Sequence, residues 1–514
     1  MNISLKEYQT ASGEIILYTG NPNFDKLEHL AGGPGDIWHS SFEQGYKNAF
    51  PEIVYQTAVF FWYLNDFDNL DECVSWRINP NHFAVRKSVW EVSKGFDLNF
   101  KNPQLQALDF GFRCLRYMGG VPLYVKGLFD DTKIETVNIS STDRYLFFLK
   151  NFKKQHSFWM MYRRGLWKVS EWKAYFKAKK EVKKINYSGV MPPRELKEIE
   201  GNPTASYIIP TMFRQDFTAQ LLEDLSRQSV LPKQVLIVDA TPEDERNDAA
   251  YLTKEYPFEV ITIWQQSKGS CRARNEAIAV TKGDYIIFGD DDIRIPNDFI
   301  ENHIRLLQTY NAGACNGLDI RADYHTQGLN DLELKLEKLG NSRWNVGATP
   351  NFSNANSCVK RAFVQQLIGN DVNFDGGYGE DSDFGLSLAK LGVTVLFNPF
   401  SANLHLKPPS GGYRFWGMQS KLTGKKRKKQ PWELDTPVKS VHPVPSPTIM
   451  YGILKQYSPE QLIEYKHKHF ANYIFKGSKA GIFYRILRLP YKNLQFKKSV
   501  FYAKQLLKLG ARHQ

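Results

Sequence analysis

The chain has 514 residues, of which 42% are hydrophobic and 14% aromatic. This length suits about three domains, and the apolar content excludes a disordered or collagen-like chain. The net charge of +13 is uneven: residues 415–514 hold 20 Lys and Arg against 4 Asp and Glu, and residues 144–200 hold 15 against 5. Such basic segments indicate a nucleic acid, an anionic membrane surface or a phosphate-bearing substrate as partner, or simply solvated helix faces.

The compartment is indicated by the N-terminus, the hydropathy and the cysteines. Residues 1–17 include three charged side chains and lack the apolar block of a signal peptide. No run of about 18 apolar residues occurs. The five cysteines are widely spaced without a Cys-x-x-Cys pair, which favours a reducing compartment over a disulfide framework or structural zinc. We expect a soluble, cytoplasmic protein.

Residues 1–143 contain an internal echo of the C-terminal half. Residues 85–87 (VRK) and 109–111 (DFG) match residues 359–361 (VKR) and 383–385 (DFG), both at an offset of 274 residues. Two matches at one offset suggest a duplication. Only 84 residues precede the first match, which leaves little room for a nucleotide-binding half. We therefore expect residues 1–143 to hold a partial domain.

The next segment, residues 144–200, is rich in Lys and aromatic residues. Trp159, Tyr162 and Leu166 recur at helical spacing. This pattern predicts a basic, aromatic helical connector.

A strand-helix alternation begins at Thr204. Apolar runs predict strands at 206–210, 235–239, 260–264 and 285–288, and helical spacing predicts helices at 216–228 and 271–280. This alternation is typical of a parallel sheet with both faces covered. Ligands bind beyond the carboxyl ends of such strands. Pro210-Thr211, Asp239 and the triplet 290–292 all fall at such ends.

The triplet Asp290-Asp291-Asp292 is the strongest chemical signal in the chain. Adjacent carboxylates repel one another unless a cation or a donor-rich ligand lies among them. In extended backbone, Asp290 and Asp292 share a face and can hold one hard cation, whose open positions a diphosphate can fill. The alternative is an acidic helix N-terminus without a ligand.

These segments together resemble family 2 glycosyltransferases of the GT-A fold, over residues 204–406. Five segments occur in the family's order: SYIIPT at 206–211, Val238-Asp239, GSCRARN at 269–275, FGDDD at 288–292 and GEDSD at 379–383. The family's usual second acid after Asp239 is Ala240 here. The resemblance implies an inverting transferase that uses a nucleoside-diphosphate sugar.

Donor and metal contacts are implied position by position. The nucleotide-sugar would be bound by Pro210, Thr211, Asp239, Arg274, Asp290 and Asp291. Asp292 would hold Mn²⁺ or Mg²⁺, which neutralises charge growing on the leaving diphosphate. His405 ends an apolar strand where some relatives place a metal-binding His, although a lone His is more often structural.

The acceptor side is implied by the late acidic segment. Asp381 would be the general base, and the neighbouring Glu380 would raise its pKa toward neutrality; an acidic cap on a helix is the alternative interpretation. Trp344 and Tyr378 could stack on sugar rings, and Lys360 stands where relatives line the acceptor pocket. In the N-terminal echo, Gln106 and Ala107 replace Glu380 and Asp381.

The predicted architecture is therefore α/β with four parts. These are a partial, non-catalytic GT-A-like module (1–143), the helical connector (144–200), a GT-A glycosyltransferase domain (201–414), and a basic Pro-containing linker with an amphipathic helical tail (415–514).

The predicted function is a metal-dependent inverting hexosyl- or N-acetylhexosaminyltransferase, with UDP-sugars favoured as donors. The acceptor would be a hydroxyl of a growing bacterial-type surface glycan or lipid-linked saccharide. The basic tail suggests peripheral contact with the inner face of an anionic membrane, and no nucleic acid is expected because no recognisable binding module is present. Two alternatives stay open: a catalytically silent carbohydrate-binding scaffold of the same fold, and a bifunctional transferase using both halves.

Overall fold

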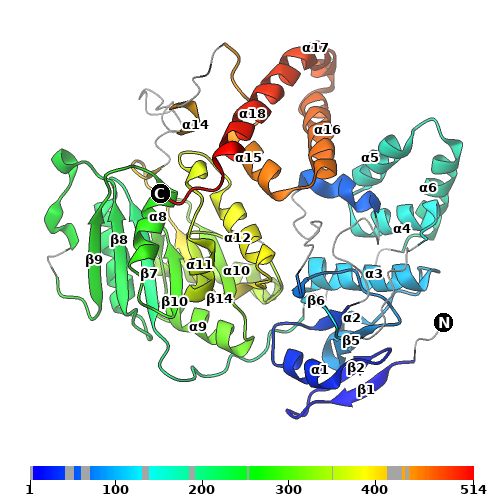
Figure 1. Cartoon of the computed structure of the whole chain (residues 1–514), viewed down its shortest axis with the longest axis horizontal. Coiled ribbons are helices and arrows are strands. Elements are labelled where there is room, and N and C mark those ends of the chain that lie inside the picture. Colours follow the sequence, from blue (N-terminus) through cyan, green and yellow to red (C-terminus); the bar gives the residue numbers. More distant parts are fainter. Residues whose placement is uncertain are drawn as a thin grey trace.

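The structure is a computed structural model of the whole chain. It describes residues 4–40, 51–59, 70–129, 138–183, 191–251, 254–349, 351–413, 431–434, 438 and 440–514. Figure 1 shows two α/β bodies side by side, with the helices of the C-terminal region extending above them.

The C-terminal body is built on an eight-stranded sheet in the order β11-β14-β12-β13-β10-β7-β8-β9. Its strands are β7 (Ala205–Thr211), β8 (Gln234–Asp239), β9 (Glu259–Trp264), β10 (Tyr285–Gly289), β11 (Ile293–Arg294), β12 (Ala314–Arg321), β13 (Asn356–Lys360) and β14 (Val395–His405). The four predicted strands all form, each within one residue of its predicted bounds. They are neighbours, and they pair in parallel. Every residue of β7, β8 and β10 is buried, which explains why these strands appear in the sequence as apolar runs.

Beyond β10 the sheet is mixed rather than wholly parallel as predicted, although β12 and β14 pair in parallel. Strand β13 runs antiparallel to both β10 and β12, and β11 runs antiparallel to β14. The reason is that Asn356, at the start of β13, pairs with Gly289, at the end of β10. The chain therefore enters β13 from the edge where β10 leaves the sheet.

Helices cover both faces of this sheet. They are α7 (Gln215–Ser226), α8 (Ser270–Ala279), α9 (Phe299–Thr309), α10 (Leu329–Leu339), α11 (Arg361–Leu367) and α12 (Glu380–Lys390). The α/β class with the GT-A layout predicted for this domain is confirmed: parallel strands on one side, and an antiparallel β13 beyond the acidic triplet.

The N-terminal body is a six-stranded sheet in the order β1-β2-β5-β3-β6-β4. Its elements are β1 (Lys6–Gln9), β2 (Ile15–Tyr18), α1 (Phe24–Ala31), β3 (Ile37–His39), η1 (Pro51–Val59), β4 (Glu72–Val74), β5 (Phe83–Arg86), α2 (Lys87–Ser93), α3 (Pro103–Arg113), η3 (Cys114–Met118) and β6 (Pro122–Val125). Trp38 and Trp76 are fully buried in its core.

Helices α5 (Lys154–Arg164) and α6 (Val169–Glu181) fall within the segment expected to be a helical connector, and α4 (Ser141–Asn151) begins three residues before it. The tail is also helical, with α14 (Pro431–Leu434), α15 (Pro447–Gln456), α16 (Pro459–Phe475), α17 (Ile482–Leu487) and α18 (Leu489–Leu509). We call α15–α18 the helical arm. The basic run 425–429 lies outside the described residues.

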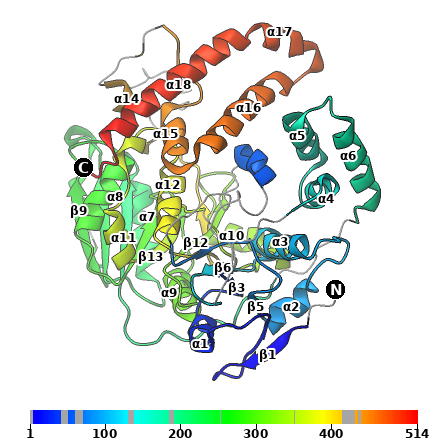
Figure 2. The same ribbon diagram turned by 45° about the vertical axis from the view of Figure 1, so that its right-hand side comes forward.

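The arm projects from the two bodies, with α17 at its outer end in both views (Figures 1 and 2). Helix α16 begins with a capping box, in which Ser458 and Gln461 satisfy each other's backbone N–H groups, followed by Pro459 at the first helical position. Within the part of the chain that the structure describes, no helix combines the length and the apolar character needed to cross a membrane.

After α18, residues 510–513 turn back onto the C-terminal body. The backbone carbonyl of Arg512 accepts from Val372 N at 2.8 Å, and the Arg512 side chain donates to Asn373 Oδ1 at 2.8 Å. The carbonyl of His513 accepts from Asn275 Nδ2 on α8 at 2.8 Å. The chain's last described residues are thus attached to the segment that precedes α12.

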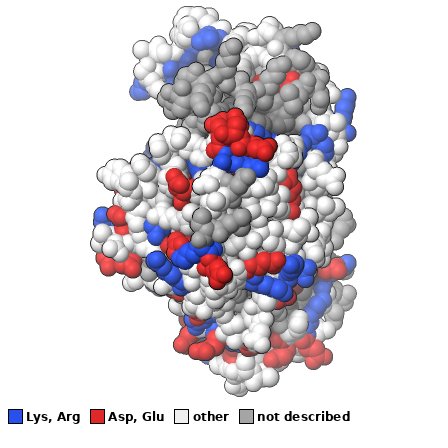
Figure 3. Space-filling model, turned by 90° about the vertical axis from the view of Figure 1, so that its left-hand side faces the viewer, with Lys and Arg blue, Asp and Glu red and all other residues white. Residues whose placement is uncertain are grey.

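Charge is mixed over the body. On the face shown in Figure 3, basic and acidic side chains alternate and neither sign covers a continuous area. Part of the excess of positive charge in the tail lies on the helical arm, with Arg485 on α17 and five Lys along α18.

Candidate active site

Polar side chains gather beyond the carboxyl ends of β7 and β10. There they enclose a cavity of about 380 Å³, a size that suits a small ligand. Its charged lining consists of Arg214, Arg274, Asp290, Asp291, Asp292, Arg321, Glu380, Asp381, His405 and Lys407. Carboxylates and cations are interspersed, as a site for an anion with a bridging cation requires.

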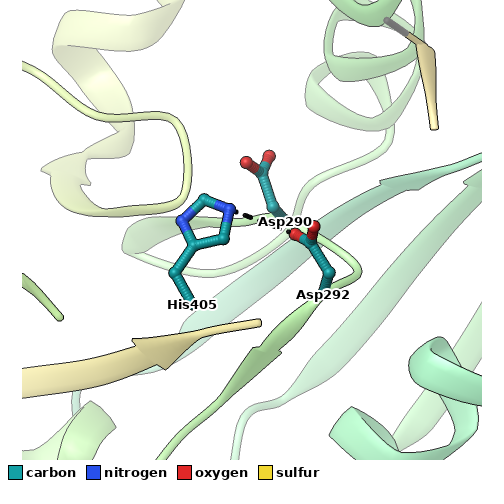
Figure 4. Close-up of side chains that lie close together, drawn as sticks. All are labelled: Asp290, Asp292 and His405. Atoms are coloured by element: carbon teal, nitrogen blue, oxygen red, sulfur yellow. Dashed lines mark ion pairs between the residues drawn. The ribbon is translucent and has the colours of Figure 1, made fainter. Parts of the chain in front are cut away.

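Three of these residues form a potential metal site. Asp290, Asp292 and His405 each offer one ligand atom, and these atoms lie within 4.8 Å of one another (Figure 4). The antiparallel pairing of β11 with β14 brings His405 opposite Ile293, next to Asp292. Two carboxylate oxygens and one imidazole nitrogen suit Mn²⁺ or a similar divalent cation. The residues present therefore fit the predicted metal.

His405 is held between two carboxylates. Its Nε2 lies 3.3 Å from Asp292 Oδ1, and its Nδ1 lies 3.0 Å from Asp319 Oδ1. Burial lowers the pKa of His405, but the hydrogen bonds with Asp292 and Asp319 outweigh it and raise the pKa to about 10. Sequence reasoning missed Asp319, which lies on β12 and reaches His405 only because β12 and β14 are neighbours.

Asp291 points to the β7 side of the cavity. It accepts from Thr211 Oγ1 at 2.8 Å, and its Oδ1 lies 3.0 Å from Arg214 Nη1. The same Arg214 nitrogen lies 2.9 Å from Asp292 Oδ2. Burial raises the pKa of Asp291 to about 7, although Arg214 opposes the shift. Arg214 was also missed, and its position three residues after Thr211 is the signal that could have found it.

Arg274, on α8, reaches across to the triplet. Its Nη2 lies 2.7 Å from Asp290 Oδ1, and the side chain is almost fully buried. The pKa of Arg274 is lowered by burial but raised more by Asp290 and by Asp381. The guanidinium therefore stays charged beside the cavity, where it can contact an anionic group.

Asp239, like Thr211, is fully buried and does not line the cavity. Asp239 lies at the end of β8, where Tyr251 Oη donates to it at 3.0 Å and Gln215 Nε2 at 3.1 Å. Pro210, at the end of β7, lines the cavity, whereas the Thr211 hydroxyl is turned toward Asp291.

Glu380 and Asp381 form the first turn of α12 and line the same cavity as the triplet. Gly379 precedes them with a φ of +114°, a conformation that favours glycine. Asn354 Nδ2 donates to Asp381 Oδ1 at 2.6 Å. Burial, and then the charge of Glu380, raise the pKa of Asp381 to about 7. A carboxyl poised near neutral pH can act as a proton acceptor.

The three predicted acceptor residues are not brought together. Tyr378 lines the cavity and is about half exposed. The ring of Trp344 instead packs on Phe400, with centroids 5.1 Å apart. Lys360 pairs with Tyr285 at the start of β10, so it lies at the other end of β13, about 13 Å along the strand from the site. The antiparallel direction of β13 places it there.

Comparison with known proteins identifies the family of this domain. The family described as "Glycosyl transferase family 2" matches residues 206–367. These residues belong to glycosyltransferase family 2. The match confirms the resemblance based on the motifs at 206–292, and it does not extend to the N-terminal module.

Two curated relatives are similar to parts of the chain. An "Uncharacterized glycosyltransferase" of Haemophilus influenzae is 25% identical over 142 residues, which are 26% of this chain and 47% of the relative. The "Uncharacterized glycosyltransferase YwdF" of Bacillus subtilis is 32% identical over 104 residues, which are 20% of this chain and 38% of the relative. The chain thus spans less than half the length of the curated relatives it matches.

Similar solved structures include a mannosyltransferase from Pyrobaculum calidifontis in complex with GDP-Man and Mn²⁺. Its identity to this chain is 18% and its TM-score 0.33, over 60% of this chain and 87% of that one. TarS residues 1–349 of S. aureus give a TM-score of 0.36 at 13% identity, over 60% of this chain and 93% of that one.

Proposed function

We propose that this protein is a metal-dependent inverting glycosyltransferase that moves a sugar from a nucleoside diphosphate, with UDP-sugars favoured, to an acceptor hydroxyl. The observation that carries the proposal is the arrangement of one cavity. The group Asp290, Asp292 and His405 and the carboxyl of Asp381, whose pKa is raised to about 7, line this same cavity.

The donor side would use the metal group and the cations. Asp290, Asp292 and His405 would hold Mn²⁺ or Mg²⁺, which when bound supplies positive charge to the leaving diphosphate. Arg214 and Arg274 would turn from the carboxylates they now neutralise toward phosphate oxygens. Asp239 would contact the nucleoside, as the family resemblance implies.

The acceptor side would use Asp381. Its carboxylate would take the proton of the acceptor hydroxyl while the acceptor oxygen bonds to the anomeric carbon and the bond from that carbon to the diphosphate breaks. Attack from the face opposite the diphosphate inverts the anomeric centre. Tyr378, at the cavity edge, would contact the acceptor sugar. The acceptor we propose is a surface glycan or a lipid-linked saccharide.

Nucleotide-dependent thermal stability tests the donor site. Unfolding would be followed with Mn²⁺ and UDP, GDP, CDP or dTDP for the wild type and for Asp292→Asn. A ligand at 100 times its Kd adds about 2.7 kcal/mol to the free energy of unfolding, so one nucleotide should raise Tm by several degrees, only with metal and only in the wild type. Asp323→Asn, at an exposed Asp–Lys pair, is the control and should behave as the wild type. No shift with any nucleotide would favour the scaffold alternative.

We also propose that the tip of the helical arm contacts an anionic membrane. Phe475, Phe483 and Leu487 are each more than 60% exposed, beside Arg485 and Arg488. Apolar rings flanked by cations suit the interface of an anionic bilayer. Binding to phosphatidylglycerol-containing vesicles, absent with pure phosphatidylcholine and lost in Phe483→Asp/Leu487→Asp, would support this contact. Equal binding by the double variant would contradict it.

A further inference from the structure

The N-terminal sheet repeats the arrangement of one half of the C-terminal sheet. The order β6-β3-β5-β2 corresponds to β14-β12-β13-β10, and these strands also follow one another in the same order along the chain. A short strand, β4 or β11, lies at the same edge of each sheet, but β4 follows β3 in the chain whereas β11 precedes β12. Strand directions agree at every step: the pair β3 and β6 is parallel like β12 and β14, and the other three pairs are antiparallel in both sheets. Four strands that match in sheet order, in direction and in order along the chain make chance likeness a poor explanation.

The backbone repeats the same unusual turn. Lys94 follows α2 with a φ of +59°, and Ile368 follows α11 with a φ of +61°. Left-handed backbone is uncommon for residues other than glycine and is disfavoured for a β-branched residue such as Ile368. A left-handed glycine follows each, Gly95 and Gly369. Both pairs are separated by 274 residues, the offset of the sequence echo.

Both halves also contain the same buried ion cluster. In the N-terminal half, Lys150 Nζ lies 2.5 Å from Asp97 and 2.7 Å from Asp109, and Asn151 Nδ2 donates to Asp109 at 2.9 Å. Asp97 and Asp109 keep the 274-residue offset from their counterparts in the other cluster. Lys150 and Asn151 end α4.

The second cluster has the same geometry. Lys455 Nζ lies 2.9 Å from Asp371 and 2.7 Å from Asp383, and Gln456 Nε2 donates to Asp383 at 2.6 Å. Lys455 and Gln456 end α15, 305 residues after Lys150 and Asn151. Helix α4 therefore corresponds to α15, and the helix that follows, α5, to α16.

The corresponding helices α5 and α16 contact each other reciprocally. Arg163 on α5 lies 2.6 Å from Glu464 on α16. Lys468 on α16 lies over the ring of Trp159 on α5, 5.7 Å from its centroid. With the offset of 305, Lys468 corresponds to Arg163, and Glu464 to Trp159. Arg163 on α5 contacts Glu464 on α16, and its counterpart Lys468 on α16 contacts Trp159, the counterpart of Glu464, on α5. Such a reciprocal pair of contacts is the signature of a two-fold interface.

We infer that residues 15–164 and 285–475 are two copies of one unit, a half-sheet followed by helices, and that the copies pair through α5 and α16 as the subunits of a dimer would. The N-terminal copy is a built-in, non-catalytic partner. Gln106 and Ala107 stand where the other copy has Glu380 and Asp381, and both are buried in α3.

The helical arm, through α15, contacts the segment that carries Glu380 and Asp381. Thr448 on α15 accepts a hydrogen bond from the backbone N–H of Tyr378 at 3.3 Å. Lys455 on the same helix binds Asp383, two residues after Asp381 on α12. Helix α15 therefore holds both ends of the acidic loop, residues 376–383, and the N-terminal copy holds α16, which follows it. Lys455 is a positioning residue; this role rests on the proposed function.

Hydrogen exchange of the full-length protein tests the pairing without substrate. Arg163→Glu places a second acid beside Glu464, so the amides of residues 376–383 should exchange roughly threefold to tenfold faster. The charge-swapped variant Arg163→Glu/Glu464→Arg should restore most of the protection. Lys254→Glu, which breaks an exposed pair with Glu223, is the control and should leave residues 376–383 unchanged.

Unchanged exchange in residues 376–383 with Arg163→Glu would overturn the inference, as would a charge swap that restores nothing. If Arg163→Glu does not fold, Arg163→Gln removes the charge without reversing it and should give a smaller increase. Hydrogen exchange is measured without substrate or turnover. If the protein bound no nucleotide, the proposed function would be refuted, but the exchange measurement would still test the pairing of α5 with α16.

Discussion

At the residue scale, the site depends on carboxyl groups whose protonation is set by their neighbours. Asp381 lies partly buried beside Glu380, and desolvation followed by the charge of Glu380 raises its pKa to about 7. Asp292 instead pairs with His405 and Arg214, and the hydrogen bond and charge of His405 hold its pKa below the usual value despite burial. One acid is thus poised to exchange a proton while the other stays ionised for a cation.

The pH profile of transfer should report Asp381. Its carboxylate accepts a proton only when ionised, so kcat/KM should rise with pH, level off above about 7 and fall about tenfold per pH unit below it. Asp381→Asn should lower kcat by about 10²–10⁴-fold and remove this limb. Steady-state rates from pH 5.5 to 8.5 check this, and a variant that keeps the acid limb would assign it to another group.

Asp319 should tune metal affinity without touching the metal. It accepts from His405 and fixes the ring, and loss of such an outer carboxylate typically weakens metal binding about 10–100-fold. Calorimetric Mn²⁺ titration of Asp319→Ala should show this loss. Asp323→Ala, an acid two residues beyond β12, should titrate as the wild type, and equal affinities in all three proteins would contradict the role of Asp319.

At the element scale, the backbone at the start of α12 determines where Glu380 and Asp381 lie. Gly379 adopts a φ of +114°, and a Cβ there would lie 3.1 Å from the Phe374 ring. The backbone can therefore turn sharply before Glu380 and Asp381, which places both acids at the cavity rather than along the helix surface.

Gly379→Ala should consequently impair the site more than the fold. The strained backbone should cost about 1–2 kcal/mol of unfolding free energy, and displacement of Asp381 should lower kcat by about 10²-fold. Gly328→Ala is a matched control, because Gly328 precedes α10 with open space around it. Denaturant unfolding and rates check both, and equal activity of the two variants would argue against a positional role for Gly379.

The strands and the acidic residues at their ends could be predicted from the sequence, whereas several contacts between the site residues could not. The strand ends at Asp239 and Asp290 could be predicted because buried parallel strands are apolar runs that stop at polar residues. The misplacement of Lys360 shows the limit, since the direction of β13 depends on a pairing across the sheet. Asp319 and Arg214 were missed because their partners become neighbours only in the folded structure.

At the scale of the whole molecule, the two copies allow a direct comparison. Lys150 and Lys455 bridge equivalent pairs of carboxylates, although Lys150 is more deeply buried and Arg113 also pairs with Asp109. The sequence echo at an offset of 274 pointed to related halves. The echo could not show that α4 and α5 correspond to α15 and α16, because these helices are separated by 305 residues instead of 274 and share little sequence.

Lys150→Met and Lys455→Met should both destabilise the protein and should act differently on activity. Lys455→Met leaves Asp371 and Asp383 without their cation, which should cost about 3–5 kcal/mol of unfolding free energy. Lys150→Met should cost less, because Arg113 still pairs with Asp109. Only Lys455→Met should reduce kcat and shift the pH profile, because only its copy carries Asp381. Thermal unfolding and rates at 20 °C check this. Loss of a second, separable transfer reaction in Lys150→Met would indicate a bifunctional enzyme.

The attachment of residues 510–513 to α8 and to the segment before α12 has a consequence for synthesis. Those residues leave the ribosome roughly 130 positions after Asp381. At about 5–20 residues per second, this interval lasts roughly 7–26 s. During that time the nucleotide-binding strands can already fold, while Val372 and Asn373 still lack the partners that residues 510–513 provide. A nascent chain would thus be able to bind a donor before it could transfer the sugar.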